Sequence, residues 1–340
     1  MSGNLEVNAD GTFNAAYAGD APWWETGKLG KKVPADISSA EICKVANVDW
    51  EVEKRPLFFE ENQNGIMKKA HGKQALVRVS DNKLLDFVGQ DWEPLQNEEA
   101  FEFFDEFVRV GKMTMESAGC IDRNGKLNVW ALANINKPFE IFKGDVIQPY
   151  LLFSNPHIYG RTIDISETDV RVVCDNTLTW ALSKMAKQLK NADASVRSVR
   201  VGHRRKFNPE MVKDALLMVS ERNETFREAA KFLGSKMYKN ETLLGYLDRV
   251  FPAATKKNVD PKKPKAYSRN AKIAADIVNT QPGAEFGRGT WWQAFNSVTY
   301  MTDHIVGHNA MNRADSAWFG SKKSMKQKAF EIALECAEVA

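Results

Sequence analysis

Two groups of residues combine side chains that could perform chemistry. Cys174 lies in the run Val-Arg-Val-Val-Cys-Asp-Asn-Thr, and a thiolate nucleophile there would need a base such as His203 or His304. Because Cys174 follows β-branched residues typical of a buried strand, we interpret it as a small core residue. Short polar side chains often satisfy the first amides of a helix, so residues 175–177 are expected to cap one.

The second group is Asp303, His304 and His308, with the two histidines four residues apart on one face of an expected helix. That spacing can bind a metal, but the group lacks the glutamate of an HExxH motif. We therefore expect a hydrogen-bonded helix end, no metal, no other cofactor and no catalytic residue. The glycine-rich residues 283–289 lack the Gly-Lys-Ser/Thr of a P-loop, so they predict a flexible entry to a helix beginning near Thr290.

The cations are concentrated in two segments. Residues 184–206 hold eight Lys and Arg against one acid, and residues 256–272 hold seven against one, so the rest of this +3 chain carries about −10. Such a distribution is typical of a protein that binds polyanions, and two solvated basic loops are the alternative. The residues predicted to contact nucleic acid are Lys184, Lys187, Lys190, Arg197, Arg200, Arg204, Arg205, Lys206, Lys256, Lys257, Lys262, Lys263, Lys265, Tyr267 and Arg269.

The expected type of nucleic acid is inferred from the aromatic residue among these cations and from the lack of base-reading motifs in the sequence. Lys and Arg neutralise phosphates, and an interposed aromatic residue such as Tyr267 can stack on a base. The sequence has no helix-turn-helix, zinc-finger or RNA-recognition signature, which argues against base-specific readout. We expect binding that follows the backbone of a single strand.

Composition sets the broad class. A chain of 340 residues with 43% apolar and 27% charged residues is long enough for one elaborated domain or two joined ones. The sequence shows no apolar run of about 18 residues and no secretory signal, and its four scattered cysteines form no CxxC pair. We expect a cytoplasmic protein, in the host cell if phage-encoded, with no membrane contact.

The elements predict an α+β fold. From about residue 50 to 170, short and often alternating runs predict a largely antiparallel sheet, with turns at residues 80–83 and 122–126. Residues 97–111 predict an amphipathic helix that covers the sheet, and the chain after residue 177 is mostly helical. The predicted parts are an N-terminal arm with a short helix (1–50), an α+β core with the first basic segment (51–206), and a helical region (207–340) with a basic loop near 254–270.

Several motifs resemble one family. The run VRVVCDNTLTWAL (170–182), preceded by YLLFSNPH, is similar to the core of phage and plasmid proteins with domain of unknown function 932. PWWETGKLG (22–30), LLDFVGQDWEPLQNEEAFEFFDEF (84–107), ESAGCIDRNGKLNVWALA (116–133), WWQAFNSVTYMTDH (291–304) and RADSAWFGSKKSMKQKA (313–329) resemble its other blocks. Trp24 stands where the family pattern has a histidine.

The resemblance implies a role in the DNA metabolism of mobile elements. Combined with the cations, it leads to our main hypothesis, a protein that binds single-stranded DNA and anneals complementary strands without making or breaking bonds. Such a protein is expected to form a homo-oligomer, as a ring or filament. The alternatives are a metal- or thiol-dependent nucleic-acid enzyme and a phage protein that binds a host defence factor.

Overall fold

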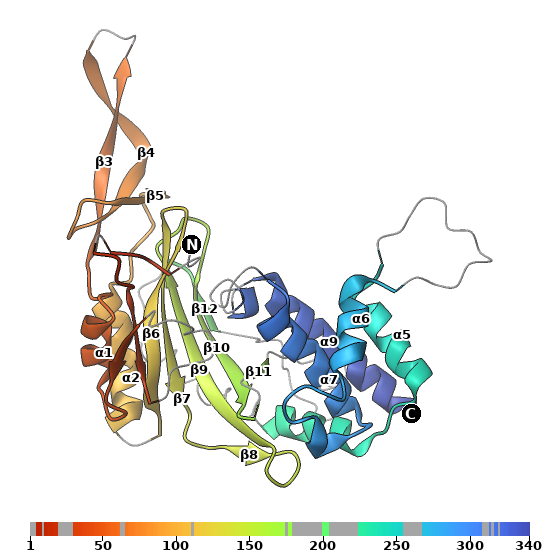
Figure 1. Ribbon diagram of the computed structural model, residues 1–340. Coiled ribbons are helices and arrows are strands. Elements are labelled where there is room, and N and C mark those ends of the chain that lie inside the picture. Colours follow the sequence, from red (N-terminus) through yellow and green to blue (C-terminus); the bar gives the residue numbers. More distant parts are fainter. Residues whose placement is uncertain are drawn as a thin grey trace, which may run out of the picture. The chain divides into compact units, whose positions relative to one another are not determined.

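The computed structural model describes residues 5–8, 10–19, 30–61, 65–109, 112–173, 176–178, 199–203, 224–253, 267–307, 313, 316–318 and 320–340 (Figure 1). The chain divides into two compact units. The first unit comprises Met1–Asn136, Tyr150–Glu167 and Ser198–Leu217. The second comprises Lys137–Pro149, Thr168–Arg197 and Met218–Ala340. The predicted division of the chain into residues 1–50, 51–206 and 207–340 stays a prediction.

The main sheet has the strand order β11-β10-β9-β7-β6-β1-β2, with β12 also beside β10 and β8 beside β9. β1 and β2 are parallel, and β6, β7 and β9 are joined by antiparallel pairings. The strands are β1 (Ala15–Ala18), β2 (Lys31–Val33), β6 (Thr114–Arg123), β7 (Lys126–Asn134), β8 (Phe139–Glu140), β9 (Val146–Pro156), β10 (Ile163–Arg171), β11 (Asn176–Leu178) and β12 (Val199–Val201). Asn124 and Gly125 both have positive φ, which is the two-residue hairpin turn expected between β6 and β7.

Two helices of the first unit, α1 (Ser39–Val45) and α2 (Asn97–Arg109), lie together over one face of this sheet (Figure 1). α1 begins with a capping box, in which the Ser38 side chain accepts from the Glu41 amide and the Glu41 carboxylate accepts from the Ser38 amide. Phe104 of α2 is fully buried and packs edge-to-face on Phe153 of β9, with 6.1 Å between the ring centroids. The predicted antiparallel sheet with its covering helix is confirmed.

A second sheet of the first unit consists of β3 (Val52–Glu61), β4 (Ile66–Arg78) and β5 (Leu84–Gly89). β5 pairs only with residues 73–77 of β4, so β3 and β4 continue beyond it as a two-stranded ribbon (Figure 1). The pairing of β3 with β4 shifts register between Pro56 and Phe58, where residues 70–73 bulge and Gly72 takes a positive φ of 78°. The sequence predicts strands over residues 55–61 and 74–80, which cover most of β3 but only the second part of β4.

The second unit is largely helical, as predicted. Its described helices are residues 224–235, α5 (Asn240–Val250), α6 (Arg269–Ile277), the short η1 (Ala284–Gly287), α7 (Trp291–Tyr300), the single π-turn η2 (Met301–Ile305) and α9 (Ser321–Glu338). Phe226, Trp292, Phe295 and Phe330 form the aromatic centre of their core. Within the described part of the chain, no helix has the length and apolar character needed to span a bilayer.

One local prediction is wrong. Asn176 and Thr177 do not begin a helix, because they belong to β11 and pair antiparallel with Arg171 and Val170 of β10. The short polar residues that favour a helix cap also favour a tight turn between strands, and here a strand follows. Cys174 and Asp175 lie outside the described residues.

Candidate nucleic-acid interface

The first basic segment joins the main sheet through β12. The register sets Val199 opposite Ile165, Arg200 opposite Asp164 and Val201 opposite Ile163 of β10. Both isoleucines are buried, so the apolar positions of the two strands are aligned. Among the described strands β12 has β10 as its sole neighbour and is therefore an edge strand. The other predicted cations of this segment, Lys184, Lys187, Lys190, Arg197, Arg204, Arg205 and Lys206, lie outside the described residues.

His203 fixes the chain just before the cations that follow β12. It is buried, and its ring stacks on Trp92 with 4.2 Å between centroids. Its Nδ1 donates to the Glu93 carbonyl oxygen at 3.2 Å, and the Glu93 amide donates to the His203 carbonyl oxygen. Burial lowers the pKa of His203 to about 4, against the weaker effect of its backbone hydrogen bonds, so the imidazole is neutral near pH 7. His203 therefore anchors the end of β12 to the loop that contains Trp92 and Glu93.

A second buried histidine joins two of the family-like motifs. His157, at the end of SNPH, donates from Nε2 to Oδ1 of Asn97 at 2.9 Å, and Asn97 is the first residue of α2. Asn155 donates to the same oxygen at 3.1 Å and to the Leu95 carbonyl oxygen at 3.0 Å. Burial lowers the pKa of His157 to about 3, with smaller contributions from nearby cationic groups. This cluster, which sequence reasoning missed, ties the start of α2 to the end of β9.

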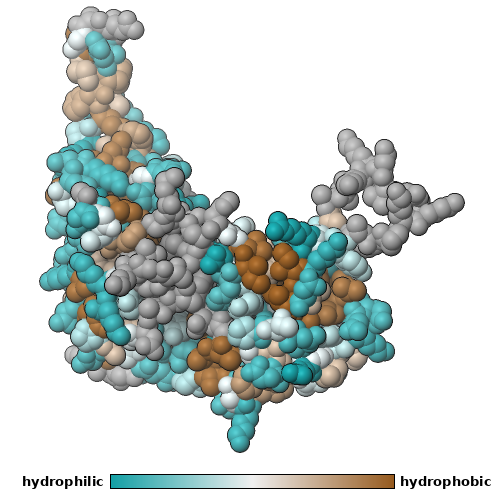
Figure 2. Space-filling view, viewed as in Figure 1, coloured by the Kyte–Doolittle hydropathy of each residue, from teal (hydrophilic) through white to brown (hydrophobic). Residues whose placement is uncertain are grey.

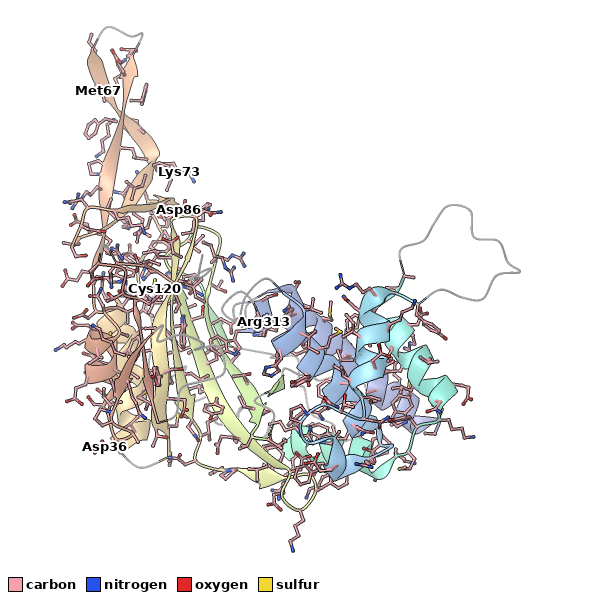
Figure 3. All side chains as sticks on the ribbon, viewed as in Figure 1. Asp36, Met67, Lys73, Asp86, Cys120 and Arg313 are labelled. Carbon is pink, nitrogen blue, oxygen red and sulfur yellow. The ribbon has the colours of Figure 1, made fainter. Side chains whose placement is uncertain are left out.

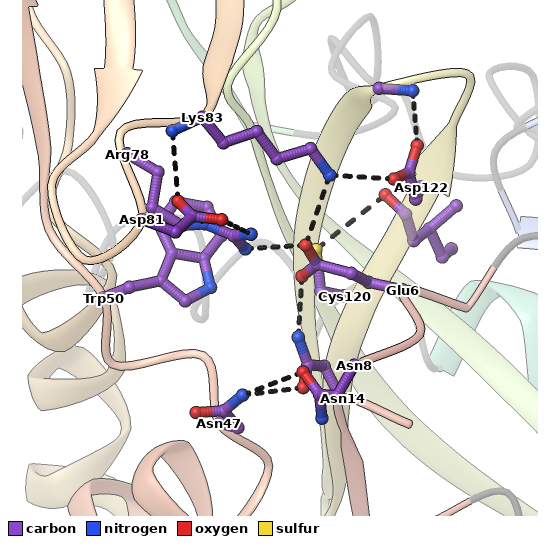
Figure 4. A network of polar contacts seen from close by, with 12 residues as sticks. Glu6, Asn8, Asn14, Asn47, Trp50, Arg78, Asp81, Lys83, Cys120 and Asp122 are labelled. Atoms are coloured by element: carbon purple, nitrogen blue, oxygen red, sulfur yellow. Dashed lines mark hydrogen bonds and ion pairs between the residues drawn. The ribbon is translucent and has the colours of Figure 1, made fainter. Parts of the chain in front are cut away.

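An ionic network anchors the three-stranded sheet to the main sheet (Figure 4). Arg78, at the end of β4, donates to Glu6 at 2.6 Å and to both oxygens of Asp81 at 2.9 and 2.7 Å. Lys83 lies 3.1 Å from Asp122 of β6 and 3.5 Å from Glu6. The hydrogen bond from Arg78 lowers the pKa of Asp81 to about 2, against partial burial. Because Glu6 and Arg78 are almost fully buried, this network fixes the base of β3, β4 and β5.

Above this base the three-stranded sheet and the turn after β9 each expose an aromatic side chain. Phe87 of β5 is 48% exposed, and Tyr159, in the turn after β9, is 45% exposed. The Lys73 ammonium lies 4.2 Å from the centre of the Tyr159 ring, and the Tyr159 amide donates to Asp86 at 3.0 Å. Figure 3 shows Lys73 and Asp86 on this sheet. An exposed ring beside an ammonium group can stack on a base while the cation contacts a phosphate.

Of the second basic segment, the structure describes Tyr267 and Arg269. Tyr267 is half-buried and packs against the helical core of the second unit. Arg269 is exposed in the first turn of α6, which Ser268 caps by accepting from the Ala271 amide at 3.2 Å. The remaining predicted cations, Lys256, Lys257, Lys262, Lys263 and Lys265, lie outside the described residues.

The arginine of the VRVVC motif is structural. Arg171 donates to both oxygens of Asp145, at 2.6 and 3.0 Å, and to the Gly283 carbonyl oxygen at 2.8 Å. Trp292 also donates to Asp145, at 2.9 Å. Arg171 and Asp145 are both buried, so this cation serves the interior of the second unit and is removed from any surface for DNA.

In the group considered for metal binding, the Asp303 carboxylate forms an ion pair with Lys326. Asp303 and Lys326 of α9 are completely buried, with Nζ of Lys326 at 3.0 and 3.3 Å from the two Asp303 oxygens. Burial lowers the pKa of Lys326, and the charge of Asp303 acts in the opposite direction. His304 stacks on Tyr300, and His308 lies outside the described residues. Within the described ranges no three His, Cys, Asp or Glu side chains form a metal site, and a cation at Asp303 would have to displace Lys326.

The family of the chain is established by a family model. Residues 84–318 match the model of domain of unknown function 932 (DUF932), which is more than half of the chain, and the protein belongs to this family. The matched part includes β5, α2, β12, α7 and the π-turn. Neither the curated proteins nor the solved structures gave a significant match.

Proposed function

We propose that this protein binds single-stranded DNA without regard to sequence and brings complementary strands together so that they anneal. The process would serve recombination or replication of a phage or other mobile element, in the cytoplasm of its host. No covalent bond is made or broken in it. Several copies, arranged as a ring or filament, would hold one strand extended.

The placement of β12 is the observation that supports the proposal best. The described piece of the first basic segment includes an edge strand of the large main sheet, and His203 anchors the chain directly after that strand. Cations that flank such an edge strand in the sequence could contact successive phosphates of an extended strand. Contacts limited to the backbone leave the base edges free to pair with a second strand.

The exposed rings of the first unit add a second line of support. Lys73 over Tyr159, with Phe87 exposed on β5, offers aromatic faces that stack on any base. Because each base has a π-face, stacking of this kind is independent of sequence. The buried pair of Asp303 and Lys326 meanwhile disfavours the alternative of a metal-dependent enzyme.

Fluorescence anisotropy with a labelled oligo-dT and with a labelled duplex tests the proposal. We expect tight binding of the single strand at about 50 mM salt, weaker binding of the duplex, and a loss of more than about 100-fold at 200 mM salt if five or more phosphates are neutralised. Annealing of two complementary labelled strands, followed by energy transfer, should be faster with the protein than without it. Absence of single-strand binding at low salt would refute the proposal.

A further inference from the structure

The ribbon, residues 57–61 of β3 and 66–72 of β4, exposes large apolar side chains. Phe58, Phe59, Ile66 and Met67 are 54%, 52%, 54% and 58% exposed. Figure 2 shows this apolar surface along the ribbon, and Figure 3 places Met67 near its end. A two-stranded ribbon without a third strand is marginally stable in water, and exposed apolar clusters of this kind mark contact surfaces.

The register divides these residues between two faces. Phe58 lies opposite Lys69 and Glu60 lies opposite Met67, so these four side chains share one face, called here the Phe58 face. On this face Phe58 and Met67 are diagonal neighbours across the two strands, and so are Lys69 and Glu60. The opposite face repeats the pattern: Phe59 lies opposite Lys68, and Glu61 lies opposite Ile66.

The charged side chains of the two faces differ in their pairing partners. On the Phe59 face, Lys68 and Glu61 form an ion pair with each other at 2.5 Å. On the Phe58 face, the Glu60 carboxylate accepts from the Gly65 amide at 2.6 Å. No ion pair joins Lys69 to another described residue. The Phe58 face therefore presents one cation and one anion that remain available to a partner.

We propose that the Phe58 face is a self-association site that docks on the Phe58 face of a second copy of this chain. A two-fold axis along the apolar diagonal would cross the two ribbons and place Phe58 on Phe58 and Met67 on Met67. The same operation sets Lys69 of each copy against Glu60 of the other. Apolar groups and opposite charges are thus satisfied together, as a two-fold interface requires. The inference goes beyond the ring or filament of the proposed function, because a two-fold contact by itself closes as a pair.

The charge of the ribbon favours a protein over a nucleic acid as the occupant. Residues 57–70 contain two acids and two lysines and have no net charge. A phosphate backbone would be repelled by Glu60 and Glu61 as much as it is attracted by Lys68 and Lys69. An identical ribbon, also neutral and apolar, has no such penalty.

Sedimentation velocity without DNA, over about a hundredfold range of protein concentration, tests the inference. The wild type is expected to associate as its concentration rises. Glu60→Lys turns both attractive contacts of the interface into repulsive ones and should weaken association by about tenfold. Adding Lys69→Glu to that variant restores the complementarity and should recover wild-type association. Phe58→Ser removes a central aromatic contact from both sides and should weaken association by more than about 30-fold.

Matched variants on the other face are the controls. Phe59→Ser, Glu61→Lys and Lys68→Glu should leave association unchanged. The inference is wrong if the wild type stays monomeric throughout, if Phe59→Ser acts like Phe58→Ser, or if the double charge exchange fails to recover association. It is also wrong if Phe58→Ser leaves the mass distribution as in the wild type. Failure of DNA binding with association intact would refute the proposed function alone.

Discussion

The two buried histidines make the stability of the first unit sensitive to acid. His157 and His203 are 0% and 3% exposed and have pKa values near 3 and 4, against an ordinary value of about 6.5. Between these values the unfolded chain binds a proton at each site and the folded chain does not. Stability attributable to each histidine is therefore present above pH 6.5 and decreases as pH falls toward 4.

The size of the effect follows from the linkage relation. At pH 5.5, one unit below the unfolded pKa, each histidine costs about 1.4 kcal/mol relative to pH 7.5, or about 3 kcal/mol for the pair. Glu116 of β6 acts in the opposite direction, because burial raises its pKa to about 7 and its hydrogen bond to Asn134 only partly offsets this. The contribution of one histidine is thus best isolated by comparing a variant with the wild type at both pH values.

Urea unfolding, followed by tryptophan fluorescence, measures that difference. His157→Gln will be less stable than the wild type at pH 7.5, because it loses packing against Trp50. Its deficit should shrink by about 1.4 kcal/mol at pH 5.5, because one proton-linked cost has been removed. His71→Gln, on the exposed part of β4, is the control and should follow the wild type at both pH values. An unchanged deficit for His157→Gln would refute the assignment of a neutral buried imidazole.

Further predictions concern burial, charge and backbone conformation. Lys326→Met leaves the Asp303 carboxylate buried without its cation and should cost about 3–5 kcal/mol in chemical unfolding, and Asp303→Asn in the same chain should recover part of it. Gly283→Ala should lower Tm more than Gly72→Ala: both glycines have φ near 77°, but a Cβ at residue 283 meets a side-chain carbon at 2.5 Å, and one at residue 72 meets nothing within 4 Å. Glu116→Gln should make the protein lose stability more steeply between pH 7.5 and 5.5 in urea unfolding, because it removes the opposing proton.

Much of the fold could be predicted from the sequence because partly buried strands and helices have apolar residues at a regular spacing. Strands such as residues 126–134 have one side or both in the core, and α2 has a clear apolar stripe. The Asn124-Gly125 turn depends on neighbouring residues alone, so local reasoning identified it.

The β4 half of the ribbon, residues 66–72, was not predicted as a strand, for the opposite reason. Residues 66–72, Ile-Met-Lys-Lys-Ala-His-Gly, are solvated on both faces, so no alternation between apolar and polar residues develops. Likewise, the Asn97, Asn155 and His157 cluster joins residues about 60 positions apart, and single polar residues give no periodic signal. The motifs that carry the family resemblance contain all three residues, which is the one signal that could have marked them.

For the candidate site, too, the sequence does not show which residues meet in the folded chain. Net charge by segment gives no means of separating surface cations from buried ones. Arg171 and Lys326 are buried in ion pairs with partners 26 and 23 residues away. Tyr267, predicted as a stacking platform, is half-buried against the helical core of the second unit.

The salt dependence of DNA binding tests the central claim most directly. Each single-strand phosphate contact contributes about 0.7 to the slope of log affinity against log salt. Changing Arg204, Arg205 and Lys206 to Gln should therefore lower that slope by about 2. Equivalent changes at the exposed Lys31, Lys32 and Lys126 should leave it unchanged. Equal slopes for the wild type and the first variant would contradict the assignment of the DNA path to the cations after β12.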